Sequence, residues 1–116
     1  MAVIKKLVED DTKPIVLRLK RKVVSDTGAV TYESIDLTDA AVDLIMQNSR
    51  TDEITNTGHQ SCDIVDEPNG VIKYSPAATD YATKGRYICD IKINYPDNTV
   101  EILYENLIIK ARKKIT

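Results

Sequence analysis

The chain has 116 residues, of which 42% are hydrophobic and 29% are charged, and its formal net charge is −2. This length predicts a single domain over residues 1–116, because domains most often contain about 100–150 residues, and the apolar fraction excludes a disordered chain. Trp and Phe are absent and all six aromatic residues are Tyr. We therefore expect a core of Ile, Val and Leu, with Tyr rings along its edge.

The first predicted strand is Pro14–Lys20, in which apolar and polar residues alternate. Ile15, Leu17 and Leu19 fall on one face, as in a strand with one buried side. Residues 25–28, Ser-Asp-Thr-Gly, predict a turn, and Tyr32–Leu37 predicts a short strand or extended link.

Ala41–Gln47 fits two structures. Its apolar residues alternate, yet the longer segment Thr38–Asn48 can also be written as three helical turns. We favour a strand, because the segments on both sides are strand-like. The polar stretch Asn48–Gly58 is expected to be a mobile loop.

A second hairpin is predicted further along the chain. Cys62–Val65 and Val71–Tyr74 are strand candidates, and the residues between them, Asp-Glu-Pro-Asn-Gly ending at Gly70, form a strong turn signal. Pro76–Lys84 is expected to be irregular or to contain a short helical turn.

The clearest strand runs from Gly85 to Tyr95. Alternate residues on one of its faces are Tyr87, Cys89, Ile91, Ile93 and Tyr95, and only Ile88 interrupts the polar face. Pro96-Asp97-Asn98 then predicts a tight hairpin turn, since Pro96 presets the first turn angle and Asn tolerates positive φ. The last two strands are expected at Val100–Tyr104 and Leu107–Ala111.

These segments predict an all-β protein, an immunoglobulin-like antiparallel β-sandwich of about seven or eight strands with Greek-key connections. One motif favours this class. Gly85 and Tyr87 precede the inward-facing Cys89 in the spacing of the tyrosine corner of such sandwiches. The alternative is an ordinary Tyr at the edge of the core. Under either interpretation, Gly85, Tyr87, Cys89, Gly70 and Pro96 have structural roles.

The charged residues are segregated. Nine acidic residues and one basic residue, Arg50, lie between Glu33 and Glu67, whereas residues 20–22 and 110–114 are basic. A nucleic-acid surface would combine one dominant basic patch with stacking aromatics, so we expect no nucleic-acid partner. This segregation suits head-to-tail docking onto other proteins.

The sequence predicts no membrane-spanning segment, no signal peptide and no disulfide framework. No apolar run approaches the about 20 residues of a membrane span, and Lys5 and Lys6 argue against a signal peptide. Two cysteines, Cys62 and Cys89, do not form a disulfide framework. We expect free thiols in a reducing cytoplasm, although the two could pair if both face the core.

Catalytic chemistry has little support in the sequence. His59 is the single histidine, and the four glycines are far apart, so no phosphate-binding loop is predicted. The segment from His59 to Glu67 holds potential metal ligands, but His59 and Cys62 would point to opposite faces of a strand. Paired carboxylates at residues 10–11 and 52–53 fall in expected loops. We therefore expect no catalytic, cofactor or metal site and no enzyme activity.

Four ordered segments carry a resemblance to a known family: Asp11–Leu17, Asp36–Met46, Asn69–Tyr74 and Asp80–Tyr87. In this order they resemble the immunoglobulin-like N-terminal domain of tailed-phage upper baseplate proteins and related small phage tail proteins. That family usually has Gly-Ala where this chain has Asp39-Ala40, and an aromatic residue where it has Ile91. The shared motifs are mainly turn and core signals, so they transfer a fold and a context.

The resemblance implies a structural protein of a phage or prophage virion. Such a protein would be synthesised in the bacterial host cytoplasm and would dock onto other tail or baseplate proteins, or onto copies of itself. The alternative is an immunoglobulin-like cell-surface or carbohydrate-binding module. That function needs an exposed aromatic platform, for which Tyr32, Tyr81 and Tyr104 are the candidates.

Overall fold

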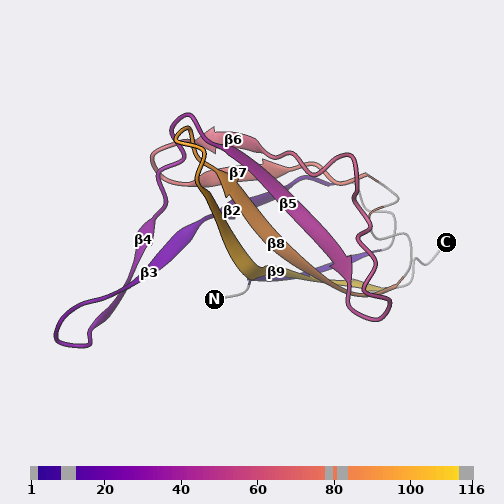
Figure 1. Ribbon diagram of the computed structural model, residues 1–116. Helices are drawn as coiled ribbons and strands as arrows, with labels where there is room; N and C mark the ends of the chain where they lie inside the picture. Colours follow the sequence, from indigo (N-terminus) through magenta and orange to yellow (C-terminus); the bar gives the residue numbers. More distant parts are fainter. Residues whose placement is uncertain (1–2, 9–12, 78–79, 81–83, 113–116) are drawn as a thin grey trace.

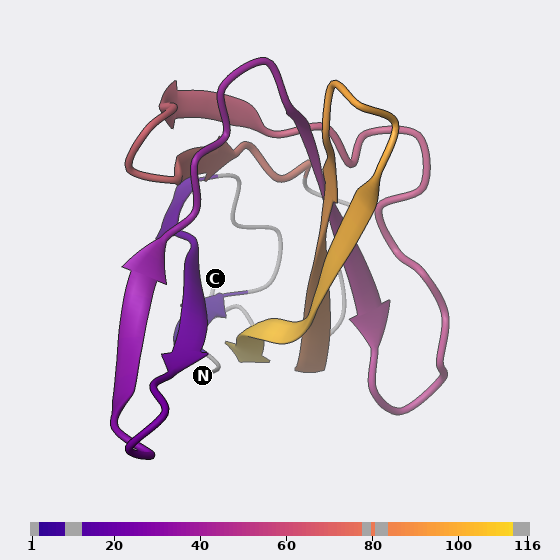
Figure 2. The same cartoon turned by 60° about the vertical axis from the view of Figure 1, so that its left-hand side comes forward.

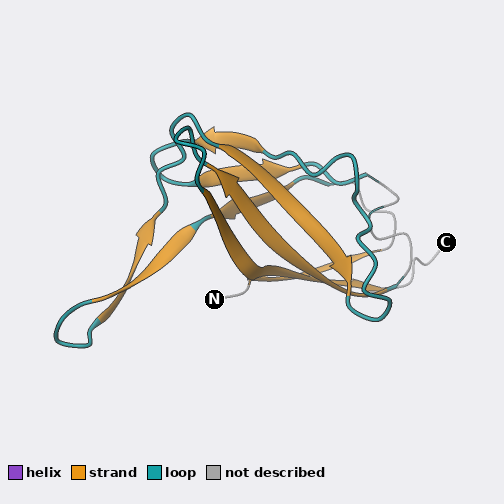
Figure 3. Ribbon diagram, in the orientation of Figure 1, coloured by secondary structure: helices purple, strands orange, loops and turns teal. Residues whose placement is uncertain are grey.

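The computed structural model describes residues 3–8, 13–77, 80 and 84–112. The described part contains strands and loops and no helix, so the all-β prediction is confirmed (Figure 3). It has nine strands: β1 Val3–Val8, β2 Ile15–Arg18, β3 Lys20–Val24, β4 Val30–Ser34, β5 Ala41–Asn48, β6 Asp63–Asp66, β7 Val71–Tyr74, β8 Gly85–Asn94 and β9 Val100–Arg112.

The strands form two facing sheets and a separate two-stranded ribbon (Figures 1 and 2). The larger sheet has the order β1-β9-β8-β5, the smaller has β2-β7-β6, and β3 pairs with β4. All pairs are antiparallel except β1 with β9, which are parallel. In the part of the chain that is described, no helix could span a membrane.

The core lies between the two sheets and follows the predicted alternation. On β8, the side chains of Tyr87, Cys89, Ile91 and Ile93 are at most 1% exposed, and β5 is a strand as favoured. The expectation for Tyr was wrong in part, because Tyr74 and Tyr87 are fully buried in the core. A buried Tyr is tolerated where its hydroxyl finds a partner, and Asn56 donates to the hydroxyl of Tyr74.

Two predicted strands end earlier than expected, because the chain passes between sheets at Leu19 and Ile35. β2 ends before Leu19, whose N–H donates to the Gly70 carbonyl at 2.8 Å. β4 ends at Ser34, after which the Ile35 N–H donates to the Leu19 carbonyl at 3.1 Å. The two segments thereby join the ribbon β3–β4 to the sandwich.

The last two predicted strands form one strand, β9, with an irregularity in the middle. Leu107 pairs with Cys89 and Leu103 with Ile91, so residues 104–106 lie opposite Asp90 alone. Glu105 has a φ of 48°, and its N–H donates to Asp90 Oδ1 at 2.7 Å. This bulge continues the strand despite the break in its alternation.

The turn at Gly70 requires glycine. Gly70 has a φ of 67°, and a Cβ there would lie 2.7 Å from the Ile35 carbonyl oxygen and 2.8 Å from that of Leu19. Both obstacles are backbone atoms at the junction between the sandwich and the ribbon. The turn at Pro96 is also tight, as predicted: the Asn98 N–H donates to the Tyr95 carbonyl at 3.0 Å, and Asn98 has a φ of 68°.

We predict that Gly70→Ala lowers the free energy of unfolding by at least about 2 kcal/mol, since it combines a left-handed backbone with a clash against fixed carbonyls. Gly28→Ala is the matched control. Gly28 has a φ of 84° but no atom within 4 Å of the added Cβ, so the cost is about 1 kcal/mol. Urea unfolding of both variants measures the difference, and equal losses would contradict the clash at Gly70.

Candidate functional site

The most prominent surface feature is the ribbon β3–β4, here called the arm, which spans Lys20–Ser34. It projects away from the sandwich (Figure 2), and its cross-strand pairs include Val24 with Val30 and Lys22 with Tyr32. Val24 is 59% exposed, Val30 48% and Tyr32 51%. These apolar side chains lie on one face of the arm and are not buried by the sandwich.

The root of the arm is anchored to the sandwich through Arg21. Its guanidinium contacts both carboxylate oxygens of Glu101, with Nε donating to Oε2 at 3.2 Å, and also donates to the Tyr95 hydroxyl at 3.2 Å. That hydroxyl donates to Glu101 Oε1 at 2.6 Å. The hydrogen bonds from Arg21 hold the pKa of Glu101 below its usual value. Because the side chains of Arg21 and Glu101 are both partly exposed, their contact orients the arm more than it stabilises the fold.

A second feature is the buried amide of Asn56, which extends the hydrogen bonding at the edge of β5. Asn56 Oδ1 accepts from the Met46 N–H at 3.0 Å, and its Nδ2 donates to the Leu44 carbonyl at 2.7 Å. The side chain therefore pairs with β5 as a strand would. Asn56 lies in the segment expected to be a mobile loop, but the structure ties this segment to β5, since the Thr55 N–H also donates to the Met46 carbonyl at 3.0 Å.

From Asn56, a polar network continues through the core toward solvent. Asn56 Nδ2 donates to the Tyr74 hydroxyl at 3.0 Å, and this hydroxyl donates to Asp80 Oδ2. The Asp80 carboxyl is fully buried, and its Oδ1 lies 3.0 Å from His59 Nε2. This last contact is not a well-directed hydrogen bond, since Oδ1 has no hydrogen-bond partner of suitable geometry among the described residues.

Burial controls the protonation of the groups in this network. Desolvation raises the pKa of Asp80 above its ordinary value, against the opposing effects of Tyr74 and His59. Desolvation, with the hydrogen bond to Asp80, also raises the pKa of Tyr74. The pairing of His59 with Asp80 was not predicted from the sequence. The side chain of His59 is 38% exposed.

Both cysteines are buried free thiols, as expected. Burial raises the pKa of Cys62 to about 12, and that of Cys89 is raised by the same cause. A high pKa keeps a thiol protonated and poorly nucleophilic at neutral pH. Among the described residues, no group of three His, Cys, Asp or Glu side chains is placed to hold a metal ion.

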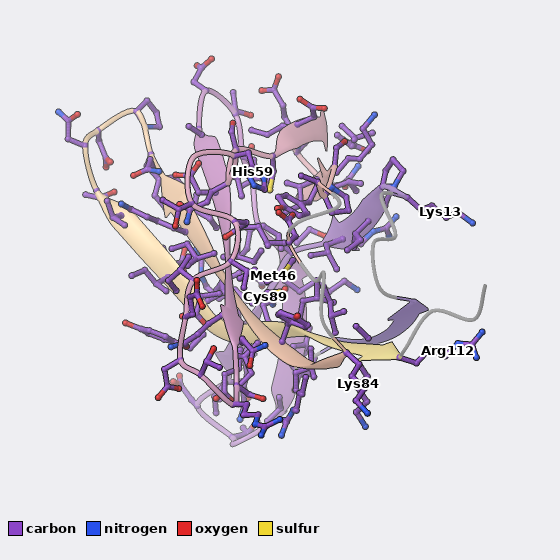
Figure 4. All side chains as sticks on the ribbon, turned by 90° about the vertical axis from the view of Figure 1, so that its right-hand side faces the viewer. Lys13, Met46, His59, Lys84, Cys89 and Arg112 are labelled. Atoms are coloured by element: carbon purple, nitrogen blue, oxygen red, sulfur yellow. The ribbon has the colours of Figure 1, made fainter. Side chains whose placement is uncertain are left out.

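At the end of the sandwich opposite the turn at Gly70 there is a basic cleft of about 700 Å³. Its lining residues are Asn48, Arg50, Thr51, Lys84, Gly85, Ala111 and Arg112. Lys84 and Arg112 extend outward from this end, on the same side of the molecule as Lys13 (Figure 4). The described lining holds three cationic residues and no acidic one, which suits an anionic partner.

The sequence-predicted structural residues lie in the sandwich. Tyr87 and Cys89 are in its core, and Gly85 begins β8. Residues 81–83, just upstream of the proposed tyrosine corner, lie outside the described residues, so that motif stays a prediction. Of the three candidate aromatics for a ligand platform, Tyr81 is also outside; Tyr32 lies on the arm and Tyr104 on β9, and both are exposed.

We predict that Tyr74→Phe lowers the free energy of unfolding by about 1–3 kcal/mol, because it removes the hydroxyl that joins two buried polar groups, Asn56 and Asp80. Tyr104→Phe is the matched control. Tyr104 is 73% exposed, so its change stays within about 0.5 kcal/mol. Chemical unfolding measures both, and a Tyr74→Phe loss as small as that of the control would contradict the network.

The raised pKa of Asp80 makes the free energy of unfolding depend on pH. A carboxyl whose pKa is raised by folding stabilises the protein fully below its unfolded pKa of about 3.9, and this contribution is lost as the pH rises through its folded pKa. The unfolding free energy of the wild type minus that of Asp80→Asn therefore decreases as the pH rises from about 3.9 through the folded pKa of Asp80.

The control is the same pair of proteins in a His59→Gln background. His59 lowers the pKa of Asp80, so removing it moves the decrease to higher pH. Unfolding curves at a series of pH values give both differences. A difference that is constant with pH, or that increases, would contradict the raised pKa.

No protein-family model matches this chain, and no curated protein matches it either. The described residues present three distinct features: a projecting arm with apolar side chains, a buried polar network that ends at His59, and a basic cleft. The arm and the cleft are open to solvent, whereas the network lies mainly inside the fold. Of these three features, the arm and the cleft are therefore the ones that another molecule can reach.

Proposed function

We propose that this protein is a structural interaction module that acts by docking onto neighbouring protein subunits. The observation that carries the proposal is the arm, whose Val24, Val30 and Tyr32 remain about half exposed. An exposed hairpin with apolar residues is costly in an isolated protein and promotes association. A partner that covers these side chains would explain their exposure.

The geometry of the arm root supports this proposal. Arg21 binds Glu101 and Tyr95 on the sandwich, so the arm leaves the body in a defined direction. A preorganised element loses less conformational entropy on binding than a flexible loop does. The basic cleft at the far end of the sandwich offers a second contact, of opposite chemical character.

The proposed context is the tail or baseplate of a phage or prophage virion. It is supported by the resemblance of the ordered segments between residues 11 and 87 to phage baseplate domains. The same proposal includes an immunoglobulin-like fold for the sandwich. Its support is the strand order: β2-β7-β6 corresponds to B-E-D and β5-β8-β9 to C-F-G of that fold, with the arm inserted between B and C.

We predict that an arm variant, Val30→Lys with Tyr32→Ser, weakens binding to the partner tail protein at least tenfold, because it removes the apolar contact and adds a buried charge. The chain is co-produced with each tail or baseplate protein encoded beside it, to find which of them binds. The affinity for that protein is then measured by calorimetry. The matched control is Val16→Lys, an equally exposed valine on β2.

The control is expected to bind like the wild type. Failure to bind any neighbouring tail protein would contradict the docking function, and equal losses in the arm variant and the control would contradict the role of the arm. Binding to a glycan array that depends on Tyr32 or Tyr104 would instead favour the carbohydrate-binding alternative.

A further inference from the structure

The first half of β9 is a free edge of the larger sheet. β9 pairs with β8 along its length, but on its other side β1 covers only Leu107–Arg112. Among the described residues, no strand pairs with that side of residues 100–106. Backbone N–H and C=O groups at such an edge can pair with another strand.

The side chains at this edge are apolar on the outer face of the sheet. Val100 is 51% exposed, Ile102 38% and Tyr104 73%. The alternate residues, Glu101 and Leu103, face inward and are less exposed. Beyond Tyr104 the regular strand is interrupted by the positive φ of Glu105, so the free edge offers five regular residues, 100–104.

We propose that two copies of this chain associate through this edge, with the two β9 strands antiparallel about a two-fold axis at Ile102. In this register Ile102 lies opposite Ile102 of the second copy, and Val100 lies opposite Tyr104. One apolar stripe then crosses the interface on the outer face, and the larger sheets join into one continuous sheet. The inference goes beyond docking by the arm, since it stands even if the arm binds nothing.

Charge selects this register over its neighbours. Directly opposite residues must share a face, so the axis moves in steps of one residue along the strand. An axis at Glu101 places Glu101 opposite itself, and an axis at Leu103 places Glu101 opposite Glu105. Like charges directly opposite are unfavourable. Of these three axes, only the one at Ile102 places Glu101 opposite an apolar residue, Leu103.

The arm leaves this edge open. Arg21 binds the carboxylate of Glu101, whose side chain lies on the inward face together with that of Leu103. The arm root therefore approaches from the side of the smaller sheet and not along the line of the β9 backbone. The same contact holds the Glu101 carboxylate on the inward face, away from the apolar outer stripe.

The test begins with sedimentation velocity over a range of concentrations. A monomer–dimer equilibrium is expected for the wild type, and Ile102→Lys raises its dissociation constant at least tenfold, because two lysines then meet at the axis. Val65→Lys is the matched control, since Val65 is 59% exposed on β6, an edge strand of the smaller sheet. It should dimerise like the wild type, and so should the arm variant of the preceding section.

Disulfide cross-linking tests the register without adding a charge. Ile102→Cys is expected to cross-link to itself at least tenfold faster than Tyr104→Cys, whereas Tyr104→Cys should cross-link readily when mixed with Val100→Cys. Native Cys62 and Cys89 are buried, so the wild type should not cross-link. A monomer at every concentration, a dimer unaffected by Ile102→Lys, or equal self-cross-linking at residues 102 and 104 would overturn the proposal.

Discussion

The packing of β8 in the centre of the larger sheet is the constraint on which the rest of the structure depends. β8 is hydrogen-bonded to β5 on one side and β9 on the other, and its inward side chains from Tyr87 to Ile93 are almost wholly buried against the second sheet. With no Phe or Trp in the chain, the core is filled by close-packed aliphatic side chains and two Tyr rings. Once β8 is placed, the registers of β5 and β9 follow.

The alternation of apolar and polar residues and the turn residues predicted those strands and turns that depend only on neighbouring residues. The alternation of β5 and β8 and the turns ending at Gly70 and beginning at Pro96 could all be read from neighbouring residues, because burial of one face and turn chemistry act over a few positions. β1 was not predicted, since Lys5 and Lys6 interrupt its apolar residues. The continuity of β9 was also missed, because a bulge shifts its alternation.

The candidate site could be predicted much less well, because its contacts join distant parts of the chain. Arg21 and Glu101 are 80 residues apart, and the partner of His59 is Asp80, beyond two strands. Asn56 lies in a polar segment that composition alone identifies as a solvent-exposed loop. It is buried because its amide satisfies backbone groups of β5, and such a role depends on the fold and not on neighbouring residues.

The arm has a consequence for how this protein can change over evolutionary time. It is inserted between β2 and β5, and its side chains contribute little to the core, so residues can be added to or removed from its tip in cross-strand pairs without altering the sandwich. If the arm binds a partner as proposed, selection for a new partner and selection for folding act on separate residues. The length and composition of this hairpin can therefore change while the two sheets remain nearly the same.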